Sequence, residues 1–293
     1  MSLIYDVSFD STTRVLSLLD KAGNVISSCE VPSKELVDDI TKPLTLKATQ
    51  DGSTVSLKKK GSPDGEFQTS RDGGNTWTDY TIDTAIPLNT GDEVSFRAKA
   101  NRTSKQSFMV NFYFEMTGKI EAWHNVMSLW RTNDFATYNT MVEAAFICLF
   151  MDCTSLTKAP VLPATTLARD CYEYMFNGCQ SLTKAPELPA TTLVFGCYSY
   201  MFQFCQSLTK APELPATTLT DYCYYYMFES CRSLKEVRIS ATSTAKGALD
   251  YWLSSVSATG DFYCDPNATI FSTGSASGIP ANWTRRNIAD YPN

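Results

Sequence analysis

The chain has 293 residues and a net charge of -6, with 43% hydrophobic and 12% aromatic residues. This length predicts about two domains, and the apolar content is enough for buried cores, which excludes wholesale disorder. Nucleic-acid binding requires a clustered basic surface, which the net negative charge argues against, so we expect no nucleic-acid partner. No run approaches the ~18 apolar residues of a membrane span, so we expect no membrane insertion.

Residues 1–40 predict a ribbon of three short β-strands. Tyr5, Val7 and Phe9 alternate with polar residues, two apolar runs follow, and Pro32 ends the third. Such a ribbon has too little core to be stable alone, so we expect it to pack either against the next domain or against another chain. In the second case it is a docking or oligomerisation segment, with Tyr5, Val7 and Phe9 as contacts. The N-terminal sequence lacks the pattern of a signal peptide.

Residues 41–117 predict an antiparallel β-sandwich, similar to immunoglobulin-like modules. Short alternating segments are separated by turn signals such as Asp51-Gly52 and Asp72-Gly-Gly74. Ser70-x-Asp72-x-Gly74-x-Thr76-Trp77 matches the Asp-box pattern. We interpret it as a turn that its aspartate stabilises, because one such box cannot build a sialidase propeller.

Residues 118–293 are organised by a 26-residue repeat. The segment 181–193 recurs letter for letter at 207–219, and at 155–167 with Val161 in place of the glutamate. This period indicates one supersecondary unit stacked on copies of itself. The cysteines follow the same step in two columns, Cys153/Cys179/Cys205/Cys231 and Cys171/Cys197/Cys223. We expect them to be buried core residues, and with His124 as the only histidine we expect no metal site.

Each repeat predicts one helix and one short strand. Cys171, Met175 and Cys179 are four residues apart, which is typical of one face of a helix. A strand follows at 181–185 and ends at Pro186. The prediction is therefore a multidomain chain: a β-meander, an Ig-like β-sandwich and a short α/β leucine-rich-repeat solenoid with caps at both ends.

The motif Met175-Phe176-x-x-Cys179-x-x-Leu182 recurs from Met201 and from Met227. It resembles the BspA-type leucine-rich repeats, whose hallmark is Ala-Phe-x-x-Cys-x-x-Leu, over about residues 140–240. The resemblance implies a surface protein of gut or oral bacteria, or a protein of their phages, without catalytic residues.

Two hypotheses follow from this resemblance. The first is a virion structural protein, such as a bacteriophage head fibre, decoration or tail appendage. Its N-terminal segment would dock on other virion proteins, and its repeats would contact a host-surface protein or glycan. The second is a bacterial cell-surface adhesin. A glycoside hydrolase would need a deep pocket with close carboxylates. No triad, phosphate loop or metal cluster is visible, so we expect no enzyme and no cofactor.

The candidate binding residues are those that change between copies of the repeat. Mixed aromatic and polar residues suit recognition of a protein or glycan, although a solvated face that has drifted would look the same. The candidates are Arg169, Phe195, Asp221, Glu173 and Tyr225, beside the tyrosine column Tyr172, Tyr198 and Tyr224. A further column, Lys158/Lys184/Lys210 beside Glu187 and Glu213, predicts an exposed ladder of ion pairs that adds little stability.

Overall fold

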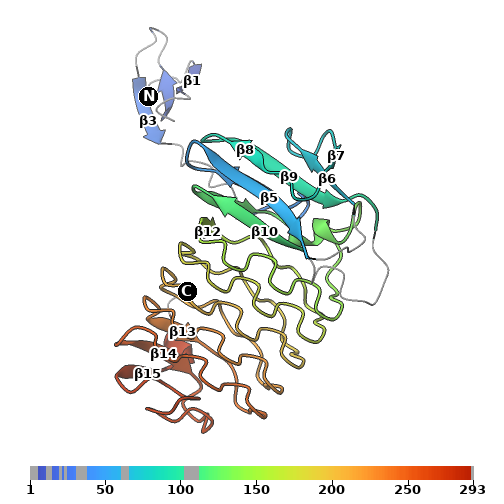
Figure 1. Cartoon of the computed structure of the whole chain (residues 1–293). Coiled ribbons are helices and arrows are strands. Elements are labelled where there is room, and N and C mark those ends of the chain that lie inside the picture. The colour runs from blue at the N-terminus through green and yellow to red at the C-terminus, as the bar shows by residue number, and fades with distance from the viewer. Residues whose placement is uncertain are drawn as a thin grey trace. The chain divides into compact units, whose positions relative to one another are not determined.

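The structure, a computed structural model, describes residues 6–10, 15–19, 22, 25–30, 38–60, 66–101 and 112–291. The chain divides into two compact units, Met1–Asp38 and Asp39–Asn293. In the first unit, β1 (Asp6–Asp10), β2 (Val15–Leu19) and β3 (Val25–Glu30) form an antiparallel sheet in sequence order (Figure 1). Val7 and Phe9 lie in β1, opposite Leu18 and Leu16. Tyr5 and the side chains of this ribbon lie outside the described residues, so the docking contacts stay a prediction.

The second unit begins with two facing β-sheets. One has the order β10-β5-β8, and the other has the order β12-β11-β4-β9-β6-β7. Phe67 packs edge-on against Phe112 at 5.1 Å, and Phe96 packs against Phe114 at 5.3 Å, so aromatic pairs join the sheets. The strands are β4 (Thr45–Ala48), β5 (Ser53–Lys59), β6 (Phe67–Ser70), β7 (Thr78–Tyr80), β8 (Ile86–Leu88), β9 (Glu93–Ala98), β10 (Phe112–Thr117), β11 (Ile120–Trp123) and β12 (Leu156–Lys158).

The Asp-box forms the turn between β6 and β7. Asp72 Oδ1 accepts hydrogen bonds from the backbone N–H groups of Asn75 (3.0 Å) and Thr76 (2.9 Å), and Trp77 Nε1 donates to the Gly74 carbonyl at 2.9 Å. The hydroxyls of Ser70 and Thr76 also bond the carboxylate, and together these bonds lower the pKa of Asp72. The predicted role of this motif as a self-bonded turn is confirmed.

Strand β11 connects the sheets to the repeats. It pairs antiparallel with β4 on one side and parallel with β12, in the first repeat, on the other. After β11, His124 has a φ of 66° and its Nδ1 accepts the Asp39 N–H at 3.1 Å. The short 3-10 helix η2 (Val126–Leu129) then leads into the repeats. A continuous sheet therefore crosses the predicted boundary between residues 117 and 118.

The predicted α/β leucine-rich-repeat solenoid is wrong, because no α-helix occurs among the described residues. Each predicted helix is instead a row of tight turns, which we call a turn row. In every turn row each fourth residue has a positive φ, for example 53° at Asp170, 55° at Tyr174 and 74° at Gly178. A left-handed residue at each turn interrupts a right-handed helix. The equivalent positions are 144/148/152, 170/174/178, 196/200/204, 222/226/230 and 247/251/255.

The backbone hydrogen bonds explain how the turn rows stack. Alternate N–H groups close a turn onto the carbonyl three residues back, as Met175 does with Tyr172 (3.2 Å). The N–H groups between them donate to the next copy, as Phe176 does with Met201 (2.9 Å). In the row 170–178 every backbone donor is thus used, alternately within the row and to the next copy. We call the resulting pile of turn rows, residues 142–256, the repeat stack.

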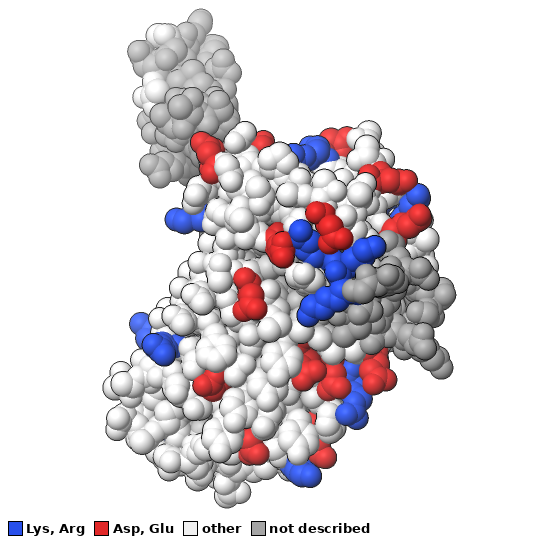
Figure 2. Space-filling model, viewed as in Figure 1, with Lys and Arg blue, Asp and Glu red and all other residues white. Residues whose placement is uncertain are grey.

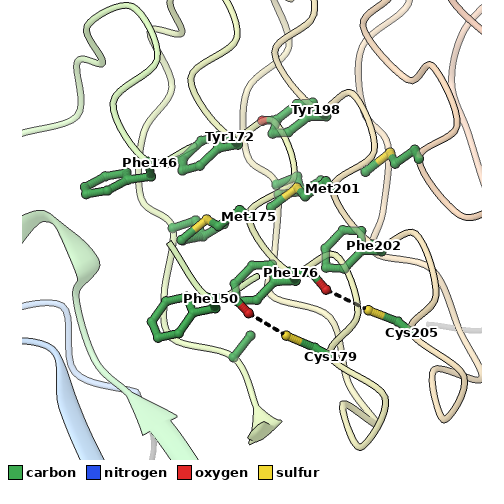
Figure 3. Packing of buried hydrophobic residues seen from close by; sticks show 14 of the residues in the cluster. Phe146, Phe150, Tyr172, Met175, Phe176, Cys179, Tyr198, Met201, Phe202 and Cys205 are labelled. Carbon is green, nitrogen blue, oxygen red and sulfur yellow. Dashed lines mark hydrogen bonds between the residues drawn. The ribbon is translucent and has the colours of Figure 1, made fainter. Parts of the chain in front are cut away.

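The core of the repeat stack consists of columns of identical or closely similar side chains (Figure 3). Phe150, Phe176 and Phe202 stack in parallel with centroids 5.5 and 5.6 Å apart. The Cys179 thiol donates to the Phe150 carbonyl of the preceding copy at 3.1 Å, and Cys205 repeats this bond to Phe176 at 3.2 Å. All free cysteines that the structure describes are buried except Cys148. Burial raises the pKa of Cys171 to about 12.

The last copies give way to a parallel sheet, β13 (Glu236–Arg238), β14 (Gly260–Cys264) and β15 (Trp283–Asn287). On β15, Arg285 Nη2 donates to the carbonyl oxygens of Ala268 (2.6 Å) and Asp265 (3.1 Å). These bonds tie the edge strand to the loop after β14. The short 3-10 helix η3 (Ile288–Asp290) ends the described chain and places Tyr291.

Candidate binding surface

The predicted tyrosine column does not lie on the surface. Tyr172, Tyr198 and Tyr224 are each 1% exposed, and they stack inside the core at 5.8 and 6.1 Å. The interpretation of these three residues as binding residues is therefore wrong. They occupy the inward position of the turn row, which Phe146 fills in the first copy. The hydroxyls of Tyr172 and Tyr198 have no hydrogen-bond partner among the described residues.

A second tyrosine column, two residues later in each copy, lies at the surface. Tyr174 stacks on Tyr200 at 4.4 Å, Tyr200 on Tyr226 at 5.3 Å, and Tyr226 on Tyr251 at 4.8 Å. Backbone hydrogen bonds between copies hold equivalent residues of successive rows close enough for their rings to stack. Tyr251, the last ring, is 45% exposed.

Three further aromatic residues extend this column sideways. Tyr225 meets the rings of Tyr200 (5.3 Å) and Tyr226 (4.6 Å) edge-on, and Tyr222 meets Tyr225 at 5.4 Å. Phe195 lies 5.4 Å from Tyr222. All these side chains are at least partly exposed. We call this surface the aromatic edge: Tyr174, Tyr200, Tyr226, Tyr251, Phe195, Tyr222 and Tyr225.

Arg169 and two carboxylates flank the aromatic edge. The Arg169 guanidinium lies over the Phe195 ring at 3.9 Å and pairs with Asp170 at 3.1 Å. Glu173 is half-buried, and burial, followed by the charge of Asp170, raises its pKa to about 7, against the opposing effect of Arg169. The structure thus brings three predicted residues, Arg169, Phe195 and Tyr225, to one surface, with Glu173 in the same turn row as Arg169.

The other changing residues have structural contacts. Asp221 is exposed, and its carboxylate accepts the Lys246 N–H at 3.2 Å, so it joins two successive copies. Asn177 Nδ2 donates to Gln203 Oε1 at 2.7 Å, and Gln203 Nε2 donates to Glu229 Oε2 at 3.0 Å. Although these three positions differ in sequence, they form one chain of hydrogen bonds along the repeat stack.

Charged groups lie sparsely over the face of the second unit in Figure 2, with broad uncharged areas on the repeats. A cavity of about 580 Å³ lies between β5, β10 and the first turn row. Of its two acidic residues, Glu115 pairs with Lys58 at 3.3 Å, and Asp152 belongs to the turn row. Within the part of the chain that the structure describes, no group of three or more potential metal ligands lies together.

The described residues also include no helix that is long and apolar enough to cross a membrane. The chain matches no protein-family model, no curated protein and no solved structure. The resemblance to BspA-type repeats therefore stays a prediction based on the repeated motif alone.

Proposed function

We propose that this chain is a non-enzymatic attachment protein that contacts a protein or glycan on a cell surface through its aromatic edge. The observation that carries the proposal is the row of four stacked tyrosines at positive φ, between 52° and 56°. A left-handed conformation costs a non-glycine residue roughly 1–2 kcal/mol, whereas glycine adopts it freely. Gly178, Gly196 and Gly247 fill other left-handed positions in the same rows.

Left-handed residues recur throughout the turn rows, so this conformation by itself marks no site; the distinguishing feature of the column is a partly exposed tyrosine in four successive copies. The tyrosine side chains are rigid, amphipathic and already aligned, so a partner would order few of them on binding. Tyrosine and arginine are also the residue types that dominate the energy of protein interfaces. The aromatic edge and Arg169 supply both types on one surface.

For the setting, we favour a virion structural protein (a bacteriophage head fibre, decoration or tail appendage) over a bacterial cell-surface adhesin. The compact unit Met1–Asp38 supports this choice, because a three-stranded ribbon with little core of its own suits docking on other virion proteins or a homo-oligomer. Immunogold labelling with antibodies against the chain tests the setting. Gold on phage particles supports a virion location, and gold on intact bacterial envelopes supports the adhesin.

Attachment is tested by binding of the fluorescently labelled chain to a panel of bacterial cells and mucin-coated surfaces. Tyr225→Ser and Tyr226→Ser should each weaken binding, by about 30-fold for a hot-spot aromatic worth ~2 kcal/mol. Phe204→Ser is the matched control, since Phe204 is 42% exposed and at a φ of 63° but outside the aromatic edge. Binding that all three variants retain would place recognition elsewhere.

A further inference from the structure

The sequence Lys-Ala-Pro-Glu-Leu-Pro occurs twice, at 184–189 and 210–215, and a related Lys-Ala-Pro-Val-Leu-Pro begins at Lys158. The three lysines occupy the same position in successive copies, and a β-bridge joins Lys158 to Lys184. Segments of the same sequence in equivalent positions present the same charged side chains and can accept the same kinds of partner. The contacts of the three segments can therefore be compared directly.

The first segment receives an aromatic ring from the chain itself. Lys158 Nζ lies 3.8 Å from the centroid of the Trp123 ring, a close cation–π contact. Val161 stands where the later copies have glutamate, so this segment has no carboxylate that requires a cation.

The third segment receives both an aromatic ring and a cation. Lys210 Nζ and the Arg238 guanidinium each lie 4.8 Å from the centroid of the Tyr291 ring. Arg238 pairs with Glu213, and Lys210 pairs with Glu236 at 3.0 Å. The Tyr291 hydroxyl donates to Glu236 at 2.8 Å and fixes the ring in place.

The middle segment receives neither. In the part of the chain that the structure describes, the exposed side chains of Lys184 and Glu187 have no ion pair, hydrogen bond or ring contact. In the copy that follows, Pro212 stands where Arg238 would be needed to pair with Glu187. Both charges line a groove of about 500 Å³, with Tyr291 and the prolines of two copies as its walls.

We propose that this groove binds a segment of a partner protein in which an aromatic side chain lies next to a basic one. The aromatic ring stacks on Lys184 and the adjacent prolines, as Trp123 and Tyr291 stack on the other two lysines. The basic group pairs with Glu187, as Arg238 pairs with Glu213. The partner thus supplies to the middle segment the aromatic ring and the cation that Tyr291 and Arg238 supply to the third.

The charge pattern of the groove selects against other ligands. An acidic segment could pair with Lys184 but would leave Glu187 without a cation, and a purely aliphatic one would leave both charges without a partner. The groove shares no residue with the aromatic edge, so its test is independent of the attachment proposal.

The test uses the full chain, labelled with ¹⁵N, and the peptide acetyl-Gly-Trp-Arg-Gly-amide followed by NMR. We expect saturable shifts of the amide signals of Thr183, Lys184 and Glu187. Replacing the peptide tryptophan by leucine, or Lys184→Met in the protein, should weaken binding about two- to fivefold, as for an exposed cation–π contact. Replacing the peptide arginine by glutamine, or Glu187→Gln, should weaken it by a similar factor, as for an exposed ion pair.

Lys235→Met is the matched control, because Lys235 is exposed but does not line the groove, and it should bind the peptide like the unaltered chain. The absence of saturable shifts up to the solubility limit of the peptide would overturn the proposal. Binding of the leucine and glutamine peptides that is as tight as binding of the parent peptide would do so as well. Sedimentation that shows dimers lost on Lys184→Met would identify a second copy of this chain as the occupant instead.

Discussion

The substitution Gly178→Ala distinguishes a turn row from an α-helix, because it should destabilise the first and stabilise the second. Gly178 has a φ of 74°, and an added Cβ would lie 2.4 Å from Asp152 Oδ1 and 3.4 Å from Asp152 Cα. The left-handed conformation costs alanine roughly 1–2 kcal/mol, and the displaced carboxylate adds to it, so we expect a loss of about 1–3 kcal/mol. Inside an α-helix, the same substitution would stabilise the chain by about 0.5–1 kcal/mol.

The assay is urea unfolding followed by tryptophan fluorescence, with the midpoint and slope of the transition compared between variants. Gly178→Ala in an Asp152→Ala background is the control, because it removes the close oxygen and leaves only the backbone cost. The loss in this background should be smaller but of the same sign. A gain in stability on Gly178→Ala in the unaltered chain would refute the turn-row structure.

Three further predictions concern buried groups of the repeat stack. Tyr198→Phe removes a hydroxyl that has no partner among the described residues, so it should raise the free energy of unfolding by about 1 kcal/mol. A lower melting temperature would mean that the hydroxyl is bonded. Cys205→Ala removes the bond to Phe176 and leaves a small void, so it should cost about 1–2 kcal/mol in urea unfolding, whereas Cys148→Ala at the half-buried position should cost less; equal costs would contradict the role of the thiol column. The pKa of Glu173 is raised to about 7 in the folded chain, so its contribution favours folding below pH 4.5 and is lost as the pH rises to about 7. The free energy of unfolding of the unaltered chain, relative to that of Glu173→Gln, should therefore fall between pH 4.5 and 7. A difference that does not change with pH would contradict this.

Residue alternation located the strands of the second unit because each strand buries one face. Leu44, Leu46 and Ala48 are fully buried, and they follow the period-two pattern around β4. The joining of β11 to β4 and β12 could not be predicted in this way. It depends on pairing between residues far apart in the chain, which leaves no local pattern.

The repeat period was readable from the sequence, but the structure of the repeat unit was not. Apolar residues four apart fit a helical face, and they fit equally a row of four-residue turns with one side chain per turn facing inward. Gly178 and Gly196 were the available signal, because they occupy left-handed positions in two different columns. A glycine that recurs at four-residue steps across aligned copies indicates positive φ rather than a helix end.

The choice of the wrong tyrosine column has a similar cause. Tyr172 and Tyr174 are two residues apart, and the same pair recurs as Tyr198 and Tyr200. The first tyrosine of each pair points inward and the second outward, but both are the same residue type, so the sequence of these copies does not distinguish them. The first copy held the missing signal: Phe146 stands at the inward position and Cys148 at the outward one. A residue without a polar group marks the buried column.

The central structural claim is that the repeat stack is held by hydrogen bonds between copies rather than within helices. Through-hydrogen-bond NMR couplings in the deuterated chain test it most directly at Phe176. We predict a coupling between the Phe176 amide nitrogen and the Met201 carbonyl carbon, whose oxygen lies 2.9 Å from that nitrogen. A coupling from Phe176 to the Tyr172 carbonyl, four residues back as in an α-helix, would contradict the claim.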